Sequence, residues 1–136
     1  MAVDQLLTQF RAARVVPVVR THETRHAATA VQWLRNAGLR IFELTMTIPD
    51  APALIRELAS DPSLLIGAGT VPNRAMAETC LAAGARFIVA PWIDASLAAH
   101  EIAGELMFVC NRGAAVRARP VGQPDIPGRQ DKHQAA

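Results

Sequence analysis

The chain has 136 residues, of which 51% are hydrophobic and 19% are charged. This length fits a single domain, and this hydrophobic fraction can build a sizeable core. Residues 1–110 hold nine arginines against ten acidic residues, so the formal net charge of +2 comes from residues 111–136. Residues 1–110 therefore lack the basic excess typical of nucleic-acid-binding domains, and we expect no nucleic-acid partner.

The cysteine content and the hydropathy of the chain indicate the cellular compartment that we expect. Two cysteines, Cys80 and Cys110, do not form a disulfide scaffold, so we expect reduced thiols. The N-terminus has an early acid, Asp4, and no long apolar run, which argues against a secretory signal. No apolar stretch approaches the roughly 20 residues of a membrane span. We expect a soluble, cytoplasmic protein without a membrane partner.

Short apolar runs recur along the chain and are rich in branched or aromatic residues, which predicts strands. The runs cover residues 15–20, 41–46, 64–70, 87–91 and 106–110. Alanine-rich segments with helical spacing lie between them, and the clearest stripe is Ala27, Val31, Leu34 and Ala37. Shorter helical stripes begin near residues 54, 76 and 97. The predicted N-caps are Asp50, Asn73 and Asp94, and the predicted left-handed C-caps are Gly38, Gly84 and Gly104.

The alternation of strands and helices predicts a parallel sheet with right-handed crossovers. A doubly wound sheet and a (β/α)₈ barrel both fit this order. In the second run, Phe42 and Leu44 share one face, whereas Glu43 and Thr45 share the other. A polar face is easiest to house inside a barrel, near its C-terminal mouth. We therefore predict a partial (β/α)₈ TIM barrel with about five strands and four helices.

Residues 111–136 differ in composition from the predicted barrel, which we place at residues 1–110. They hold three prolines, five basic residues and no aromatic residue, without a strand or helix period. This composition predicts a disordered tail, and the abrupt change suggests a frameshift or truncation in the coding sequence. The tail lacks the interleaved aromatic residues of single-strand binders, so a solvated tail is favoured over a nucleic-acid-binding one.

Other chemical signals are weaker. His22 and His26 are four residues apart, but no third ligand is placed beside them, so we favour a solvated helix face and expect no metal. A flavodoxin-like nucleotide-binding domain would need a glycine-rich loop after the first strand, and the residues that follow Arg20 do not form one. Gly67 and Gly69 could serve either close packing or a substrate loop.

Four blocks of the sequence, in matching order and spacing, resemble the 2-keto-3-deoxy-6-phosphogluconate aldolase family, which includes 4-hydroxy-2-oxoglutarate aldolases. The blocks are Val15–Arg20, Gly38–Thr45, Ile66–Val71 and Ala83–Pro91. The resemblance implies a class I aldolase without a cofactor, in which a lysine amine condenses with the keto group and the iminium accepts electrons during C–C cleavage. It also implies a small keto-acid substrate and, for the intact protein, a homotrimer.

The resemblance assigns roles to four residues at the predicted C-terminal ends of strands. It makes Glu43 the acid/base group and gives Thr70 a part in holding the substrate carboxylate. It places Arg20 facing the anionic substrate, although Arg20 could instead cap a helix or pair with Glu23. Pro91 would close the fourth strand at the pocket.

Two positions depart from the family pattern. Some members have an arginine four residues beyond the glutamate, where this chain has Thr47. The Schiff-base lysine would lie on a sixth strand, and the only lysine here is Lys132, in the tail. We therefore expect a lyase by family whose present chain stops before that lysine and is inactive alone. The alternative is a non-catalytic remnant that binds small keto acids weakly.

Overall fold

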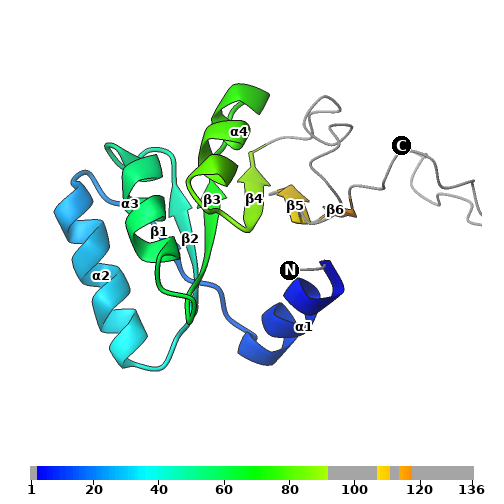
Figure 1. Ribbon diagram of the computed structural model, residues 1–136, viewed down its shortest axis with the longest axis horizontal. Coiled ribbons are helices and arrows are strands. Elements are labelled where there is room, and N and C mark those ends of the chain that lie inside the picture. The colour runs from blue at the N-terminus through cyan, green and yellow to red at the C-terminus, as the bar shows by residue number, and fades with distance from the viewer. Residues whose placement is uncertain (1–2, 92–106, 111–113, 118–136) are drawn as a thin grey trace, which may run out of the picture.

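The computed structural model describes residues 3–91, 107–110 and 114–117, which form four helices and six strands (Figure 1). In chain order these are α1 Val3–Ala13, β1 Val18–Val19, α2 Thr24–Asn36, β2 Ile41–Thr45, α3 Ala51–Ala59, β3 Leu65–Gly69, α4 Arg74–Ala82, β4 Phe87–Ala90, β5 Met107–Cys110 and β6 Ala114–Arg117. The helix predicted near residue 97 lies outside the described residues.

The strands form one sheet in the order β1-β2-β3-β4-β5-β6. The five strands β1 to β5 pair in parallel, and β6 pairs antiparallel with β5. Each strand lies beside the next one in the chain, whereas the strand order of a doubly wound sheet reverses at a switch point. The predicted α/β fold of the barrel type is therefore confirmed over the described residues.

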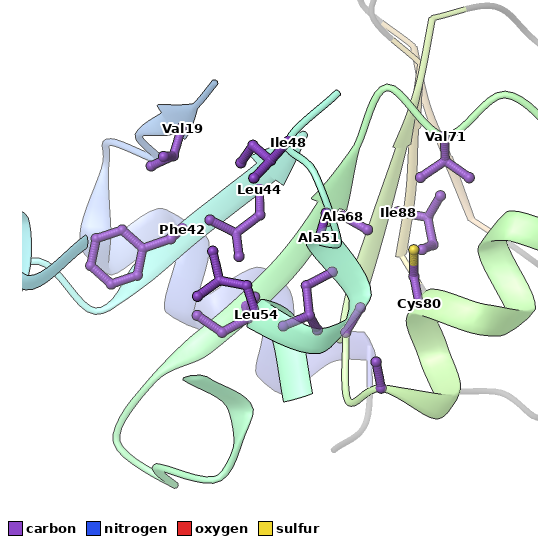
Figure 2. Close-up of a cluster of buried hydrophobic side chains, with 14 of the residues drawn as sticks. Val19, Phe42, Leu44, Ile48, Ala51, Leu54, Ala68, Val71, Cys80 and Ile88 are labelled. Carbon is purple, nitrogen blue, oxygen red and sulfur yellow. The ribbon is translucent and has the colours of Figure 1, made fainter. Parts of the chain in front are cut away.

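The main core lies between the sheet and the helices α2, α3 and α4. The strand residues Phe42, Leu44, Ile66 and Ile88 are fully buried there. Figure 2 shows that Leu44 and Ala68 point toward Ala51 and Leu54 of α3 and that Ile88 points toward Cys80 of α4. Each buried Leu or Ile contributes about 1.5–3 kcal/mol to folding, so this face carries most of the apolar stabilisation.

A second apolar cluster lies on the other face of the sheet and involves α1, which is not among the predicted helices. Leu6 of α1 packs with Ile41, Leu65 and Phe87, the first residues of three strands. The Phe10 ring meets the Phe87 ring edge-to-face, with centroids 4.9 Å apart. Helix α1 thus covers the N-terminal end of this inner face and leaves the C-terminal end to other residues.

The predicted helix ends are confirmed in most places. The side chain of Asn73 accepts a hydrogen bond of 3.0 Å from the backbone N–H of Met76. Gly38 and Gly84 follow α2 and α4 with φ angles of 97° and 108°. Asp50 stands before α3 as predicted but makes no side-chain cap bond. Its backbone is left-handed, with a φ of 55° and a ψ of 34°, whereas a capping residue is extended, so its side chain is not directed at the free N–H groups of the helix. Asp94 and Gly104 lie outside the described residues.

The predicted absence of strands after residue 110 is wrong for Ala114–Arg117, which form β6. An edge strand such as β5 offers unpaired backbone groups, and pairing with them requires no side-chain period. The domain boundary placed after residue 110 stays a prediction, and residues 118–136 lie outside the described part of the chain.

Candidate active site

Glu43 lies on the inner face of the sheet, as its alternation with Phe42 and Leu44 predicts. Its Cα pairs with that of Gly67 on β3, and the next inner pair toward the C-terminal end is Thr45 with Gly69. The side chain of Glu43 is half-buried. The core-forming residues of β2 therefore hold this carboxylate on the opposite side of the strand from the main core.

Arg20 and Thr70 follow β1 and β3, the two strands that flank β2. Because parallel strands end at the same edge of the sheet, residues 50 positions apart in the chain come together there. The Arg20 guanidinium donates a hydrogen bond of 2.9 Å from Nη2 to Thr70 Oγ1. Glu23 forms an ion pair with Arg25 instead of Arg20. Arg20 thus reaches across the end of the strand that carries Glu43.

The loops behind this contact are also tied together. Thr24, at the start of α2, donates from Oγ1 to the carbonyl oxygen of Pro49 over 2.5 Å. This bond joins the loop that follows β1 to the loop that follows β2. The backbone N–H of Val71 donates to the carbonyl oxygen of Val89 over 3.1 Å. Both loops that carry Arg20 and Thr70 are therefore anchored to their neighbours.

Two opposing effects act on the Glu43 carboxyl group. Partial burial raises its pKa above the ordinary value, and the positive charge of Arg20 lowers it by a smaller amount. The net pKa is raised. A carboxyl group whose pKa moves toward neutrality can both accept and return a proton, which is the requirement for general acid–base catalysis.

Thr70 has a strained backbone. Its φ angle is 56°, in the left-handed region that β-branched residues rarely adopt. Such a conformation costs about 1–3 kcal/mol and tends to occur where the surrounding structure needs a side chain in one direction. Here the strained residue is the one whose hydroxyl accepts the bond from Arg20.

Thr45 is a buried polar residue to which the sequence alone assigns no role. Its side chain is fully buried on the inner face, two residues beyond Glu43. Its hydroxyl lies 2.7 Å from the hydroxyl of Thr47, and either group can be the donor. The sequence does contain a signal for this position. Thr45 is two residues from Glu43, and residues i and i+2 of a strand lie on the same face.

The other end of the strands holds a different feature. A cleft of about 420 Å³ is lined by Arg40 and Arg86, by Ser63, and by Gln9 of α1. Among the described residues no carboxylate lines it, so these residues provide no acid–base group there. Arg20 and the strained Thr70 directly follow β1 and β3, at the C-terminal ends where (β/α)₈ barrels place catalytic groups, and the half-buried Glu43 lies in the middle of β2 between these strands.

Residues 6–113 match the family described as "Aldolase: KDPG and KHG aldolase". The chain belongs to this family. KDPG and KHG are 2-keto-3-deoxy-6-phosphogluconate and 2-keto-4-hydroxyglutarate, and the family acts on small keto acids of this kind. The resemblance stated from the four sequence blocks is thereby confirmed.

Individual aldolases show how much of the family fold the chain contains. It is 33% identical over 94 residues to the 2-dehydro-3-deoxy-phosphogluconate aldolase of Zymomonas mobilis, covering 69% of this chain and 45% of that protein. A crystal structure of the Zymomonas mobilis enzyme with 3-phosphoglycerate matches with a TM-score of 0.68 and 30% identity, over 79% of this chain and 52% of that one. The chain thus spans about half the length of these relatives.

A further aldolase structure, from Legionella pneumophila, contains pyruvate captured as a covalent carbinolamine intermediate. It matches with a TM-score of 0.63 and 31% identity, over 72% of this chain and 49% of that chain. The identity and the TM-score agree with those of the Zymomonas relative, so the aldolase likeness does not depend on one comparison.

The sequence also singles out Pro91, Thr47 and Lys132 in relation to the aldolase site. Pro91 directly follows β4, half-buried at the same edge as Thr70, and its role at a pocket stays a prediction. Thr47, at the position where some aldolases have an arginine, is exposed. Lys132 lies outside the described residues. Among the residues that the structure describes, no three His, Cys, Asp or Glu side chains gather as metal ligands.

Three further side chains with metal-binding or nucleophilic chemistry are His22, His26 and Cys80. His22 and His26 are exposed. Cys80 is buried, as predicted from its helical stripe, and its thiol donates to the Met46 sulfur over 3.3 Å. Burial raises the pKa of this thiol to about 11, so it is not a nucleophile. In the described part of the chain, no helix is long and apolar enough to cross a membrane.

Proposed function

We propose that Arg20, Glu43 and Thr70 form the acid–base and anion-binding part of a class I aldolase site. The substrate would be 2-keto-3-deoxy-6-phosphogluconate or a related 2-keto acid, cleaved to pyruvate and an aldehyde. The observation that carries this proposal is the Arg20–Thr70 hydrogen bond, which spans the end of the strand that holds the half-buried Glu43.

The proposed chemistry needs one group that moves protons. A lysine amine and the substrate keto group form an iminium with loss of water. The Glu43 carboxylate takes the proton of the C4 hydroxyl while the C3–C4 bond breaks, the aldehyde leaves, and the bond electrons form an enamine. Proton return to C3 and hydrolysis release pyruvate. The raised pKa of Glu43 suits a group that accepts and returns a proton in one cycle.

Arg20 would bind the negative charge of the substrate. A guanidinium has five N–H donors in a planar fork, and one of them is used on Thr70 Oγ1. The planar fork matches the two oxygens of a carboxylate, and its fixed orientation lowers the entropic cost of binding. Arg20 is exposed, so a carboxylate can reach it from solvent.

Cleavage of a 2-keto acid needs an imine-forming lysine, whereas binding of the acid by Arg20 and Thr70 does not. The only lysine of the sequence is Lys132, and it lies in the segment that does not resemble the family. We therefore propose that this chain alone binds 2-keto acids weakly without cleaving them, which is also the expectation for a non-catalytic remnant. A homotrimer of the intact protein and a cytoplasmic location belong to the same proposal.

The binding part is tested by titrating the ¹⁵N-labelled chain with pyruvate and following the backbone amide signals of Glu43, Gly69 and Thr70. Saturable shifts are expected in the native chain. Arg20→Gln should weaken binding by about tenfold, the equivalent of one charge-assisted hydrogen bond. The matched control is Arg25→Gln, which removes an exposed arginine that pairs with Glu23. Equal binding by both variants would contradict the proposal.

The lysine part is tested by borohydride reduction in the presence of pyruvate, read by intact mass. Hydride reduces an imine to a stable amine, so a working lysine acquires a permanent pyruvate adduct. No adduct is expected on this chain, whereas a full-length relative labelled in parallel should acquire one. An adduct here would contradict the proposal, and Lys132 would be the only side-chain amine that could carry it.

A further inference from the structure

The carboxylate of Glu43 lies against the backbone of Gly69. A Cβ atom added to Gly69 would lie 1.9 Å from Glu43 Oε1, 2.7 Å from Cδ and 2.8 Å from Cγ. Real Cβ atoms essentially never approach another heavy atom within 3.0 Å. The Glu43 side chain therefore occupies the space that any side chain at position 69 would fill.

The strand register explains this contact. Glu43 is paired with Gly67, and Gly69 is one inner position further toward the C-terminal end of β3. The Glu43 side chain thus leans along the strands toward the end where Thr70 accepts a hydrogen bond from Arg20. Thr45, the residue paired with Gly69 across the ladder, is fully buried and shares the inner face of β2 with Glu43.

We propose that Gly69 is a positioning residue that lets the Glu43 carboxylate lie flat on β3, next to the Arg20–Thr70 pair. A side chain at position 69 would lift the carboxylate away from the strand and out of its partly buried place. This inference rests on the proposed function for the importance of Glu43, but the contact itself is a property of the fold.

Gly67, two residues earlier on the same face, has a different role. A Cβ atom there would lie 2.2 Å from the Phe87 ring, which is buried and packed against Phe10. That ring cannot move without disrupting the inner cluster, whereas the end of a glutamate side chain can turn away. The two glycines therefore have different roles. Gly67 allows the Phe87 ring to pack in the inner apolar cluster, and Gly69 allows the Glu43 carboxylate to lie against β3.

The two alanine variants form a matched pair on one strand. The chain is labelled with ¹³C at glutamate carboxyl groups, and the pKa of Glu43 is measured by NMR titration together with the urea midpoint. Gly69→Ala should return the pKa of Glu43 toward its ordinary value and leave most of the stability. Gly67→Ala should lower the urea midpoint more and move the pKa of Glu43 less. An unchanged Glu43 pKa in Gly69→Ala would overturn the inference.

A double-mutant cycle identifies the contact responsible. Gly69→Ala is compared in the native chain and in a Glu43→Ala background, where no carboxylate occupies the space. The loss of stability caused by Gly69→Ala should largely disappear in that background. An equal loss in both backgrounds would mean that the added methyl group clashes with something other than Glu43, and the inference would be wrong.

These readouts do not use keto acids, so the inference and the proposed function can fail separately. A moved Glu43 pKa in Gly69→Ala combined with no pyruvate binding by the native chain would retain the positioning role and reject the aldolase proposal. Pyruvate binding combined with an unmoved pKa would retain the aldolase proposal and reject the role of Gly69.

Discussion

At the scale of single residues, Glu43 combines partial burial with a nearby positive charge, and the two act in opposite directions. Burial is the larger effect, so the folded protein favours the protonated carboxyl group more than the unfolded chain does. An acid whose folded pKa is raised stabilises the fold below its unfolded pKa, and this contribution is lost as the pH rises through the folded pKa.

This linkage predicts how Glu43→Gln behaves. Glutamine removes the ionisation, so the variant should be more stable than the native chain near pH 7, with a difference that shrinks toward pH 4. Urea denaturation across this pH range measures it, and Glu57→Gln, an exposed position on α3, is the control. A stability difference that grows as the pH falls would mean that the pKa of Glu43 is lowered in the folded state.

Thr70 and Arg20 illustrate a residue-scale feature that depends on the fold. The left-handed φ of Thr70 is unfavourable for a β-branched residue, and the sequence alone favours an ordinary extended conformation. The contact with Arg20 joins strands that are not adjacent to each other, since β2 lies between them. Strain at Thr70 is therefore a consequence of tertiary structure, and it directs the hydroxyl toward the guanidinium.

At the scale of elements, α1 acts as a cover for the inner face. Leu6 is fully buried, and Phe10 contacts the Phe87 ring at the N-terminal end of β4. Without α1, Ile41, Leu65 and Phe87 would be exposed on that face. The helix therefore keeps the N-terminal half of the inner face apolar and leaves the polar residues Glu43 and Thr45 near the other end.

Phe10→Ala should test this role of α1. Replacing a fully buried Phe with Ala lowers the free energy of unfolding by about 3–5 kcal/mol. Because Phe10 is only partly buried, we expect a loss of about 2–3 kcal/mol. The urea midpoint should fall while its slope stays unchanged. Trp33→Ala is the control, because Trp33 is 72% exposed on α2. Equal effects of the two substitutions would mean that α1 does not pack on the sheet in solution.

At the scale of the whole molecule, β1 is the shortest strand of the described sheet. It has two residues, and within the described residues its outer edge pairs with no strand. Val15, which precedes β1, is 58% exposed, and Val18, within it, is 56% exposed. An apolar strand edge with unpaired backbone groups favours pairing between molecules.

We expect concentration-dependent self-association of the chain, which sedimentation velocity measures. Val15→Glu should reduce it, because a charge at a strand edge opposes pairing with a second chain. Trp33→Glu, an equally drastic change at an exposed apolar residue of α2, should reduce it less. A native chain that sediments as a monomer at all concentrations would contradict the prediction.

The sequence predicts the α/β class, the five parallel strands to within a few residues and the inner position of Glu43. These follow from local signals, namely period-two alternation, helical stripes and cap residues such as Asn73 and Gly38. It missed α1 and β6, and it predicted β1 too long because Pro17 has no N–H for the ladder.

The surroundings of Glu43 depend on the tertiary structure. Neither the hydrogen bond between Arg20 and Thr70 nor the contact of the carboxylate with Gly69 has a local sequence signal. Both depend on strand order and register, which bring together residues 26 to 50 positions apart. The Gly-Ala-Gly-Thr string left packing and substrate roles open for both glycines, and the register is what separates Gly67, under Phe87, from Gly69, under Glu43.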